Sequence, residues 1–109
     1  MIVVFRHLFY RNYVGLSLWP FIILKHAKLK EDRVLINHER IHLRQQLELL
    51  VVPFYILYLL EWGIRTLFYF DGYRAYRNIS FEREAYGNEL KSDYLSRRRP
   101  LSFIKYLWG

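Results

Sequence analysis

The distribution of apolar residues along the chain predicts a short sheet followed by helices. Residues 14–24 are rich in β-branched and aromatic types and contain Gly15 and Pro20, a pattern typical of strands with an edge or a bulge at the proline. Residues 25–32 are mostly polar, and Asp32 stands directly before a helical pattern, where its side chain can cap the first turn. A small sheet is therefore expected to lead into a helix.

Two long helices are predicted next. Apolar positions at helical spacing favour a helix over about residues 33–52. Pro53 lacks a backbone N–H and clashes with the preceding turn, so we expect a kink or a stop there and a second helix to about Phe70. Segment 49–70 contains Glu61 and other polar residues, and its uninterrupted apolar part is shorter than the about 20 residues that cross a bilayer. We expect a buried core helix, with membrane insertion or surface attachment as the alternative.

A third helix is expected near the carboxyl end. An aspartate-glycine pair is typical of a turn, and a connection rich in Tyr and Arg follows it. Ser80 can cap a helix over about residues 81–95, and the sequence RRRP at 97–100 ends it. Because we find neither a repeat nor a flexible linker, the whole chain, 1–109, is expected to form one α+β domain.

The amino-acid composition limits which metal ligands and which partners the chain can have. The chain has 109 residues, of which 53% are hydrophobic, and this suits one compact core and excludes disorder over most of the chain. It has no cysteine, so any metal must be held by His and carboxylate ligands. The net charge of +7 favours anionic partners such as acidic lipid or nucleic acid. A nucleic-acid binder would rest on this charge alone, because no basic and aromatic motif accompanies it, so we do not expect that partner.

The first residues of the chain indicate the cellular compartment in which the protein is expected. Residues 1–8 lack the basic start, the long apolar stretch and the small-residue cleavage site of a secretory signal. We therefore expect a cytoplasmic protein, with peripheral membrane contact as the alternative.

The sequence HERIH, which begins at His38, fits the HExxH pattern of zinc metallopeptidases. His38 and His42 are four residues apart, so they lie about 6 Å apart along one helix face, and both imidazoles can reach one tetrahedral ion. Glu39, about 100° round the helix, can reach a water on that ion, which is the position of a general base. His7 and His26 have no such spacing and are expected at the surface or a sheet end. The alternative is a polar helix face with no metal.

A catalytic zinc site usually takes three protein ligands and leaves one position open. Glu82 and Glu84 are candidates for the third ligand, although carboxylates in the first turn of a helix also complement its dipole. Because they are two positions apart, they point about 200° from each other and cannot both face one ion. Glu48 and Glu61 are the next candidates.

These motifs make the chain similar to the zincin metallopeptidases, and more narrowly to the gluzincins, in which a Glu from a later helix completes HExxH. The resemblance covers residues 38–46 and 81–88, and the Gln pair after the second His is similar to that of short zincin-like domains. The gluzincin motif Glu-x-x-Ala-Asp aligns with EREAY, which begins at Glu82, so the resemblance selects Glu82 as the third ligand. It makes Ala85 the small residue that lets two helices approach. It also places Tyr86 where the family has an Asp that orients the first His.

The resemblance implies a minimal zincin-like α+β fold, with a short N-terminal sheet packed on an active-site helix and two further helices. It implies that Zn²⁺ is held by His38, His42 and Glu82, and that Glu39 is the catalytic base for hydrolysis of a peptide or protein substrate. An extended peptide would pair with an edge strand, a role that residues 18–24 can fill.

Two tyrosines and the fate of Glu84 complete the list of candidates. Tyr76 and Tyr86 can orient a metal ligand or donate to an oxyanion, although packing is an ordinary use of tyrosine. If Glu82 is the ligand, Glu84 is expected to face solvent or to pair with an Arg. Since Tyr86 replaces an Asp, the alternative function is a catalytically inactive zincin-like protein that acts as a membrane-associated or adaptor protein.

Overall fold

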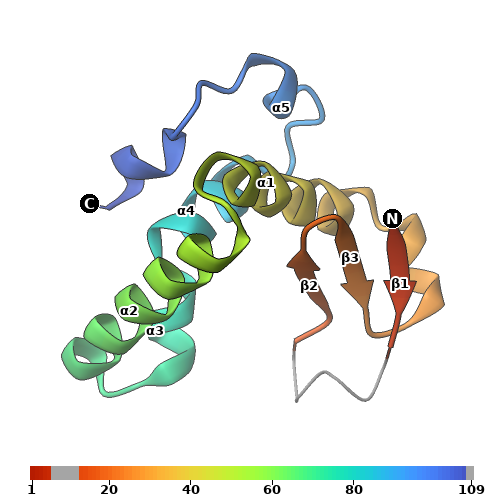
Figure 1. Cartoon of the computed structure of the whole chain (residues 1–109). Helices are drawn as coiled ribbons and strands as arrows, with labels where there is room; N and C mark the ends of the chain where they lie inside the picture. The colour runs from red at the N-terminus through yellow and green to blue at the C-terminus, as the bar shows by residue number, and fades with distance from the viewer. Residues whose placement is uncertain (6–12, 108–109) are drawn as a thin grey trace.

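The computed structural model describes residues 1–5 and 13–107 and has the α+β architecture that the sequence predicts (Figure 1). A small sheet packs on helix α1, and helix α2 extends away from the sheet (Figure 1). The elements in chain order are β1 (Ile2–Val4), β2 (Gly15–Leu18), β3 (Phe21–Leu24), the 3-10 helix η2 (Ala27–Glu31), α1 (Arg33–Leu49), α2 (Val51–Tyr69), α3 (Gly72–Asn78), α4 (Ser80–Asn88), α5 (Tyr94–Arg97) and the 3-10 helix η3 (Ser102–Tyr106). His26 is exposed just before η2, and His7 lies outside the described residues.

The sheet has the strand order β1-β3-β2. β2 and β3 form an antiparallel hairpin whose turn contains Trp19 and Pro20, so the proline lies in a turn and not in a strand. β1 pairs with β3 in parallel, with Ile2 opposite Ile22, and no local pattern reveals a pairing over this separation. Because β3 is hydrogen-bonded on both sides, the prediction that 18–24 is an edge strand for a peptide is wrong for β3. The edge strand that packs on α1 is β2.

Helix α1 begins as predicted but ends earlier. Asp32 Oδ1 accepts a hydrogen bond from Leu35 N at 3.0 Å and caps the first turn. Leu50 takes φ 68° and ψ 154°, which breaks the helix, and its carbonyl accepts from Phe54 N at 3.0 Å at the start of α2. The break lies one turn before Pro53, whose ring would clash with the Leu49 carbonyl if the helix continued, so the predicted stop is confirmed. Pro53 lies in the first turn of α2, where a backbone N–H would have no intrahelical partner.

Helix α2 is not the buried core helix that the sequence predicts. Phe54 is its one buried residue, and 6% of its most apolar 18-residue window lies inside the structure. It is the one helix of the described residues that is long and apolar enough to cross a membrane. The apolar pattern predicts a helix that avoids water, but a pattern along the chain does not say which surface covers the helix.

The chain after α2 is divided into more helices than predicted. The Tyr- and Arg-rich connection is helix α3, which Asp71 caps. Ser80 is not a cap but the first residue of α4, and it donates its N–H and O–H to Glu61 at 2.7 and 2.6 Å. The predicted third helix ends at Asn88, because Asn37 of α1 donates to backbone carbonyls of the turn that follows. This tertiary contact is absent from the local pattern that predicted a longer helix.

Two apolar clusters fix the helices against one another. The first holds α2 to α4 and η3 and consists of Phe54, Ile79, Phe81 and Phe103. The second holds α1 to α4 and α5 and consists of Ile41, Ala85 and Tyr94. Ala85 is completely buried between α1 and α4, which fits the expectation that a small residue lets these helices approach. The polar face of α1 is thereby held against the first turns of α4.

Candidate metal centre

Helices α1 and α4 bring three candidate ligands to one point. His38 Nε2 and His42 Nε2 lie 3.0 and 2.9 Å from Glu82 Oε1, and 3.2 Å from each other. All three residues are 4% exposed. The sequence predicted this set, and the structure places its three ligand atoms within 4.8 Å of one another, so the group could hold a metal ion.

The spacing of these atoms matches that of ligands around one ion. Zinc binds His nitrogens and carboxylate oxygens at about 2.0–2.2 Å in a tetrahedral arrangement, which separates neighbouring ligand atoms by about 3.3 Å. The three observed separations of 2.9 to 3.2 Å differ from this value by only a few tenths of an ångström. Small side-chain adjustments would therefore admit an ion of this size.

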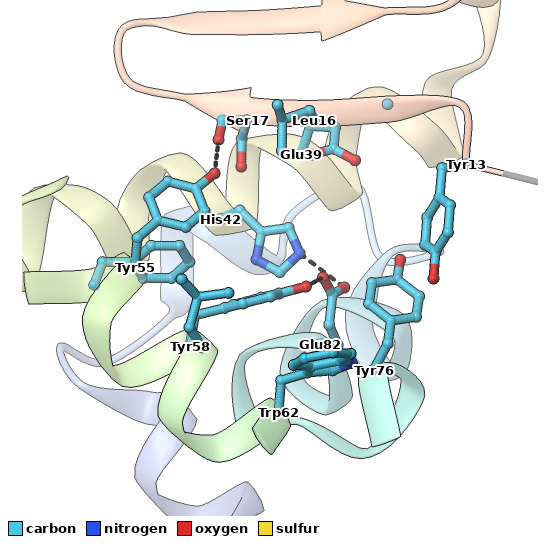
Figure 2. A pocket seen from close by; sticks show the side chains of 13 residues that line it. Tyr13, Leu16, Ser17, Glu39, His42, Tyr55, Tyr58, Trp62, Tyr76 and Glu82 are labelled. Atoms are coloured by element: carbon cyan, nitrogen blue, oxygen red, sulfur yellow. Dashed lines mark hydrogen bonds and ion pairs between the residues drawn. The ribbon is translucent and has the colours of Figure 1, made fainter. Parts of the chain in front are cut away.

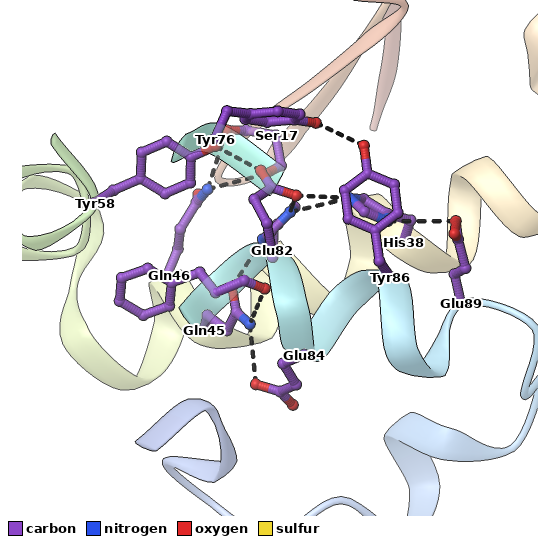
Figure 3. Close-up of polar contacts among 12 residues, drawn as sticks. Ser17, His38, Gln45, Gln46, Tyr58, Tyr76, Glu82, Glu84, Tyr86 and Glu89 are labelled. Atoms are coloured by element: carbon purple, nitrogen blue, oxygen red, sulfur yellow. Dashed lines mark hydrogen bonds and ion pairs between the residues drawn. The ribbon is translucent and has the colours of Figure 1, made fainter. Parts of the chain in front are cut away.

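Gln45 fixes the orientation of His42. Its amide nitrogen donates to Phe81 O at 3.2 Å and to Glu84 Oε1 at 3.0 Å, and neither of these oxygens can donate in return (Figure 3). The amide oxygen of Gln45 must then face His42 Nδ1, which lies 2.8 Å away. His42 therefore carries a proton on Nδ1, and its Nε2 points at Glu82. The sequence analysis did not find this role for Gln45.

His38 has a carboxylate beside its other ring nitrogen. Glu89 Oε2 lies 3.4 Å from His38 Nδ1, but the two atoms are not aligned for a hydrogen bond. Among residues 1–5 and 13–107, His38 Nδ1 is the one buried side-chain nitrogen or oxygen without a hydrogen-bond partner. Tyr86 packs its ring edge-on against the imidazole at 4.4 Å (Figure 3). Tyr86 thus contacts His38, but Glu89 provides the nearby carboxylate. Since Glu89 lies two helical turns after Glu82, helical spacing could have indicated it.

Tyr58 orients the third candidate ligand. Its hydroxyl donates to Glu82 Oε2 at 2.5 Å, which leaves Oε1 for the two histidines. The sequence analysis did not identify this contact. Burial alone would raise the pKa of Glu82, but the charge of His42 and hydrogen bonds from both histidines hold it well below its usual value. Burial would lower the pKa of His42, but Glu82 outweighs burial and raises that pKa to about 9.

A proton on His42 Nε2 is the alternative to a metal ion at this point, and it explains the geometry less well. One proton on His42 Nε2 forms a hydrogen bond with Glu82, but His38 Nε2 is then left without a proton to share with Glu82. If His38 also donated from Nε2, the lone pair on its Nδ1 would face the Glu89 carboxylate, which is unfavourable. A cation shared by all three atoms accepts the lone pairs of both Nε2 atoms, so His42 keeps its proton on Nδ1 and His38 can carry a proton on the Nδ1 that faces Glu89. The chemistry of these donors therefore fits a metal ion.

Glu39 lies beside the three ligands, against strand β2. It is 5% exposed, and the Ser17 side chain beside it favours the charged form of the carboxylate and so lowers its pKa. A Cβ atom at Gly15 would come within 3.1 Å of Glu39 Oε2, so any larger residue there would crowd the carboxylate. Burial raises the pKa of Glu39, and the charges of His42 and His38 partly oppose this. The carboxylate can therefore accept and release a proton next to the candidate metal.

A pocket of about 460 Å³ opens onto this group (Figure 2). Glu39, His42 and Glu82 form part of its wall, and aromatic side chains form much of the rest. Tyr76 also lines the pocket, and its hydroxyl lies 2.8 Å from the hydroxyl of Tyr86. Burial and the nearby Glu82 carboxylate raise the pKa of Tyr76, so its hydroxyl stays protonated and can donate a hydrogen bond.

The edge of β2 is tied to the helices beside the pocket. The carbonyl of Ser17 accepts from Gln46 Nε2 at 3.0 Å and from the hydroxyl of Tyr55 (Figure 2). Gln46 Oε1 accepts from Trp19 N at 2.7 Å. These contacts fix the strand over α1, and they occupy one carbonyl that an added peptide strand could otherwise use.

The other candidate carboxylates lie away from the histidines. Glu84 is completely buried and binds the guanidinium of Arg98, with Nη2 to Oε1 at 3.1 Å. Glu48 accepts from Arg98 Nη1 at 2.7 Å and belongs to the same cluster. Glu61 pairs with Arg65 at 2.8 Å. The expectation that Glu84 pairs with an Arg agrees with this contact, although Glu84 does not face solvent.

Comparisons with known proteins add no relative. No protein-family model, no curated protein and no solved structure matches the chain. The residues of this chain and their geometry therefore carry the evidence for its function.

Proposed function

We propose that the chain is a zinc-dependent peptide hydrolase with a minimal zincin-like fold. His38, His42 and Glu82 hold the zinc, and Glu39 is the general base. The observation that carries this proposal is the convergence of two imidazole nitrogens and one carboxylate oxygen, 2.9 to 3.2 Å apart, with Gln45 fixing the tautomer of His42.

Zinc suits this set of ligands better than magnesium or calcium. Two imidazoles and one carboxylate form one of the sets found in catalytic zinc sites, whereas the harder ions prefer oxygen ligands. Bound in this way, zinc supplies an activated water near neutral pH and polarises a substrate carbonyl. Zinc ions held by only three protein ligands are typical of catalytic sites, because structural zinc sites use four protein ligands.

The residues of the chain supply the remaining parts of a hydrolytic site. Glu39 accepts a proton at its carboxylate and returns it to the leaving amine. Tyr76 donates its hydroxyl toward the oxygen that becomes negatively charged in the transition state. The aromatic wall formed by Phe54, Tyr58 and Trp62 favours a substrate with an apolar side chain next to the cleaved bond.

Removal of the general base tests the catalytic part of the proposal. Glu39→Gln should retain zinc but lose hydrolysis of a quenched-fluorescence peptide library, because the amide cannot accept the proton. Glu31→Gln is the matched control, since Glu31 is exposed on η2 and should leave activity unchanged. A Glu39→Gln variant that hydrolyses peptides as fast as the control variant would contradict the assignment.

A metal-binding protein without turnover is the second candidate function. The observation in its favour is that Gln46 and Tyr55 occupy the Ser17 carbonyl on the strand edge where a peptide would pair. Such a protein would act as an adaptor. It would bind zinc stoichiometrically and cleave no member of the peptide library, and Glu39→Gln would then change neither property.

A further inference from the structure

The part of helix α2 that faces away from the protein is entirely apolar. Every exposed position of α2 carries an apolar residue, and the strongly exposed ones define what we term the outer face: Val52, Leu59, Leu60, Ile64, Leu67 and Phe68, which are between 56% and 77% exposed. The charged residues of α2 turn inward instead. Glu61 and Arg65 pair with each other, and their side chains are 15% and 17% exposed. This arrangement is the reverse of a helix on the surface of a soluble protein.

The chemistry of the outer face fits lipid better than a protein partner. Protein interfaces keep hydrogen-bonding groups among their apolar contacts, and these set the register of the partner. The outer face has no polar side chain, and acyl chains need none. The chain carries a net charge of +7, which complements anionic headgroups. Arg74 is exposed and stacks on Tyr69 at 4.5 Å, so a cation lies at the end of α2 beside Phe70, which is 91% exposed.

The position of the metal centre between α1 and α4 restricts the orientation that α2 can take in a membrane. With 19 residues, α2 is about 28 Å long, which is close to the thickness of the hydrocarbon core. However, α1 precedes α2 and α4 follows it, and these two helices meet at His38, His42 and Glu82. Both flanks of α2 must therefore lie on the same side of a bilayer. Figure 1 shows α3 returning along α2 toward α4, as this requires.

We infer that α2 is a membrane anchor that lies in the interface of a bilayer with anionic headgroups, with its outer face among the acyl chains and without crossing the bilayer. The inward residues Tyr58, Glu61 and Arg65 of α2 contact the rest of the protein, so only one side of the helix enters the lipid. Interfacial helices of this kind bind through their buried apolar area together with attraction to anionic lipid.

This anchoring also indicates a class of substrate, a step that rests on the proposed function. Leu59 and Trp62 line the pocket at the metal centre and are also 61% and 40% exposed on α2. The mouth of the pocket therefore lies beside the lipid surface. Peptide segments held at the membrane surface would reach it, so the substrates are membrane-bound polypeptides.

Vesicle binding tests the anchor without reference to catalysis. Purified full-length protein should sediment with vesicles of equimolar phosphatidylcholine and phosphatidylglycerol. The triple substitution Leu60→Gln, Ile64→Gln and Leu67→Gln should weaken this binding at least tenfold. The matched control, Leu90→Gln, Leu101→Gln and Ile104→Gln, removes the same apolar groups from exposed positions outside α2 and should bind like the unmodified chain. Circular dichroism checks that both variants fold.

Equal binding by both variants, or no binding by the unmodified chain, would overturn the inference. A chain that forms dimers through the outer face, and ignores vesicles, would show that a second copy covers it. Because the chain has no cysteine, Lys30→Cys and Lys91→Cys report the topology separately, and both should react with an impermeant maleimide added outside the vesicles. Protection of only one of them would show that α2 crosses the bilayer. A chain that binds vesicles but cleaves no peptide would support the anchor and contradict the peptidase.

Discussion

Glu82 and Glu84 stand two residues apart on α4, are both buried, and face two different clusters of polar groups (Figure 3). Glu84 accepts hydrogen bonds from Arg98, Tyr94 and Gln45, and the guanidinium of Arg98 balances its charge. Glu82 accepts from Tyr58 and faces two imidazoles. An Arg is always charged, whereas a neutral imidazole offers only a lone pair or a neutral N–H.

The comparison separates a structural carboxylate from one arranged to bind a ligand. The cluster of Glu84 is complete, because a permanent cation lies within it and each carboxylate oxygen has donors. The cluster of Glu82 gathers three atoms that can all act as metal ligands, and no permanent cation lies among them. Gln45 connects the two clusters, since its amide nitrogen binds Glu84 and its oxygen binds His42. The structural cluster therefore supports the geometry of the candidate metal centre.

Loss of Arg98 should have the largest effect on stability. Arg98→Met removes the cation and leaves the buried Glu84 and the partly buried Glu48 without compensation, so the free energy of unfolding should fall by about 3–5 kcal/mol. Arg97→Met is the control, because its side chain is 53% exposed and its pair with Asp93 contributes little. Denaturant unfolding measures both variants. Similar losses for the two would contradict a structural role for the Glu84 cluster.

Separate replacement of the two carboxylates by alanine tests the assignment of the metal ligand. Glu82→Ala should weaken zinc affinity at least tenfold, equivalent to about 1.4 kcal/mol or more, because one of three ligands is lost. Glu84→Ala should mainly lower the free energy of unfolding and change zinc affinity less. Competition with a chelator measures the affinities. The reversed order would move the ligand to Glu84.

Substitution of Gln45, which connects the two clusters, should lower zinc affinity less than loss of the Glu82 ligand does. Gln45→Leu removes the acceptor of His42 Nδ1 and should lower zinc affinity about tenfold, as is typical when a group that orients a ligand is lost. Gln46→Leu is a matched control, because Gln46 is equally buried but binds Ser17 and Trp19 and not a histidine. Zinc affinities of the two variants that do not differ would show that Gln45 has no orienting role.

Features fixed by local chemistry could be predicted from the sequence. The Asp32 cap and the shared face of His38 and His42 follow from the geometry of one helix. The opposed directions of Glu82 and Glu84 follow from the same geometry. Each of these predictions concerns residues within a few turns of one another.

Features fixed by tertiary contacts could not be predicted in this way. Asn37 of α1 ends α4 through contacts with a turn far along the chain, and β1 makes β3 a central strand by pairing with it from the start of the chain. The contact of Tyr58 with Glu82 could not be predicted, because its hydroxyl finds a partner only when α2 packs near α4. The exposure of α2 depends on how the helix packs on the rest of the fold, which the periodicity of the sequence does not describe.

Metal content tests the central claim most directly. Protein purified without chelator and examined by native mass spectrometry and elemental analysis should carry about one zinc per chain, and His38→Ala should remove it while circular dichroism shows a folded protein. Metal-free protein that also takes up no zinc in a titration would contradict the account. A chain whose zinc stoichiometry is unchanged by His38→Ala would contradict it equally, since the metal would then lie elsewhere.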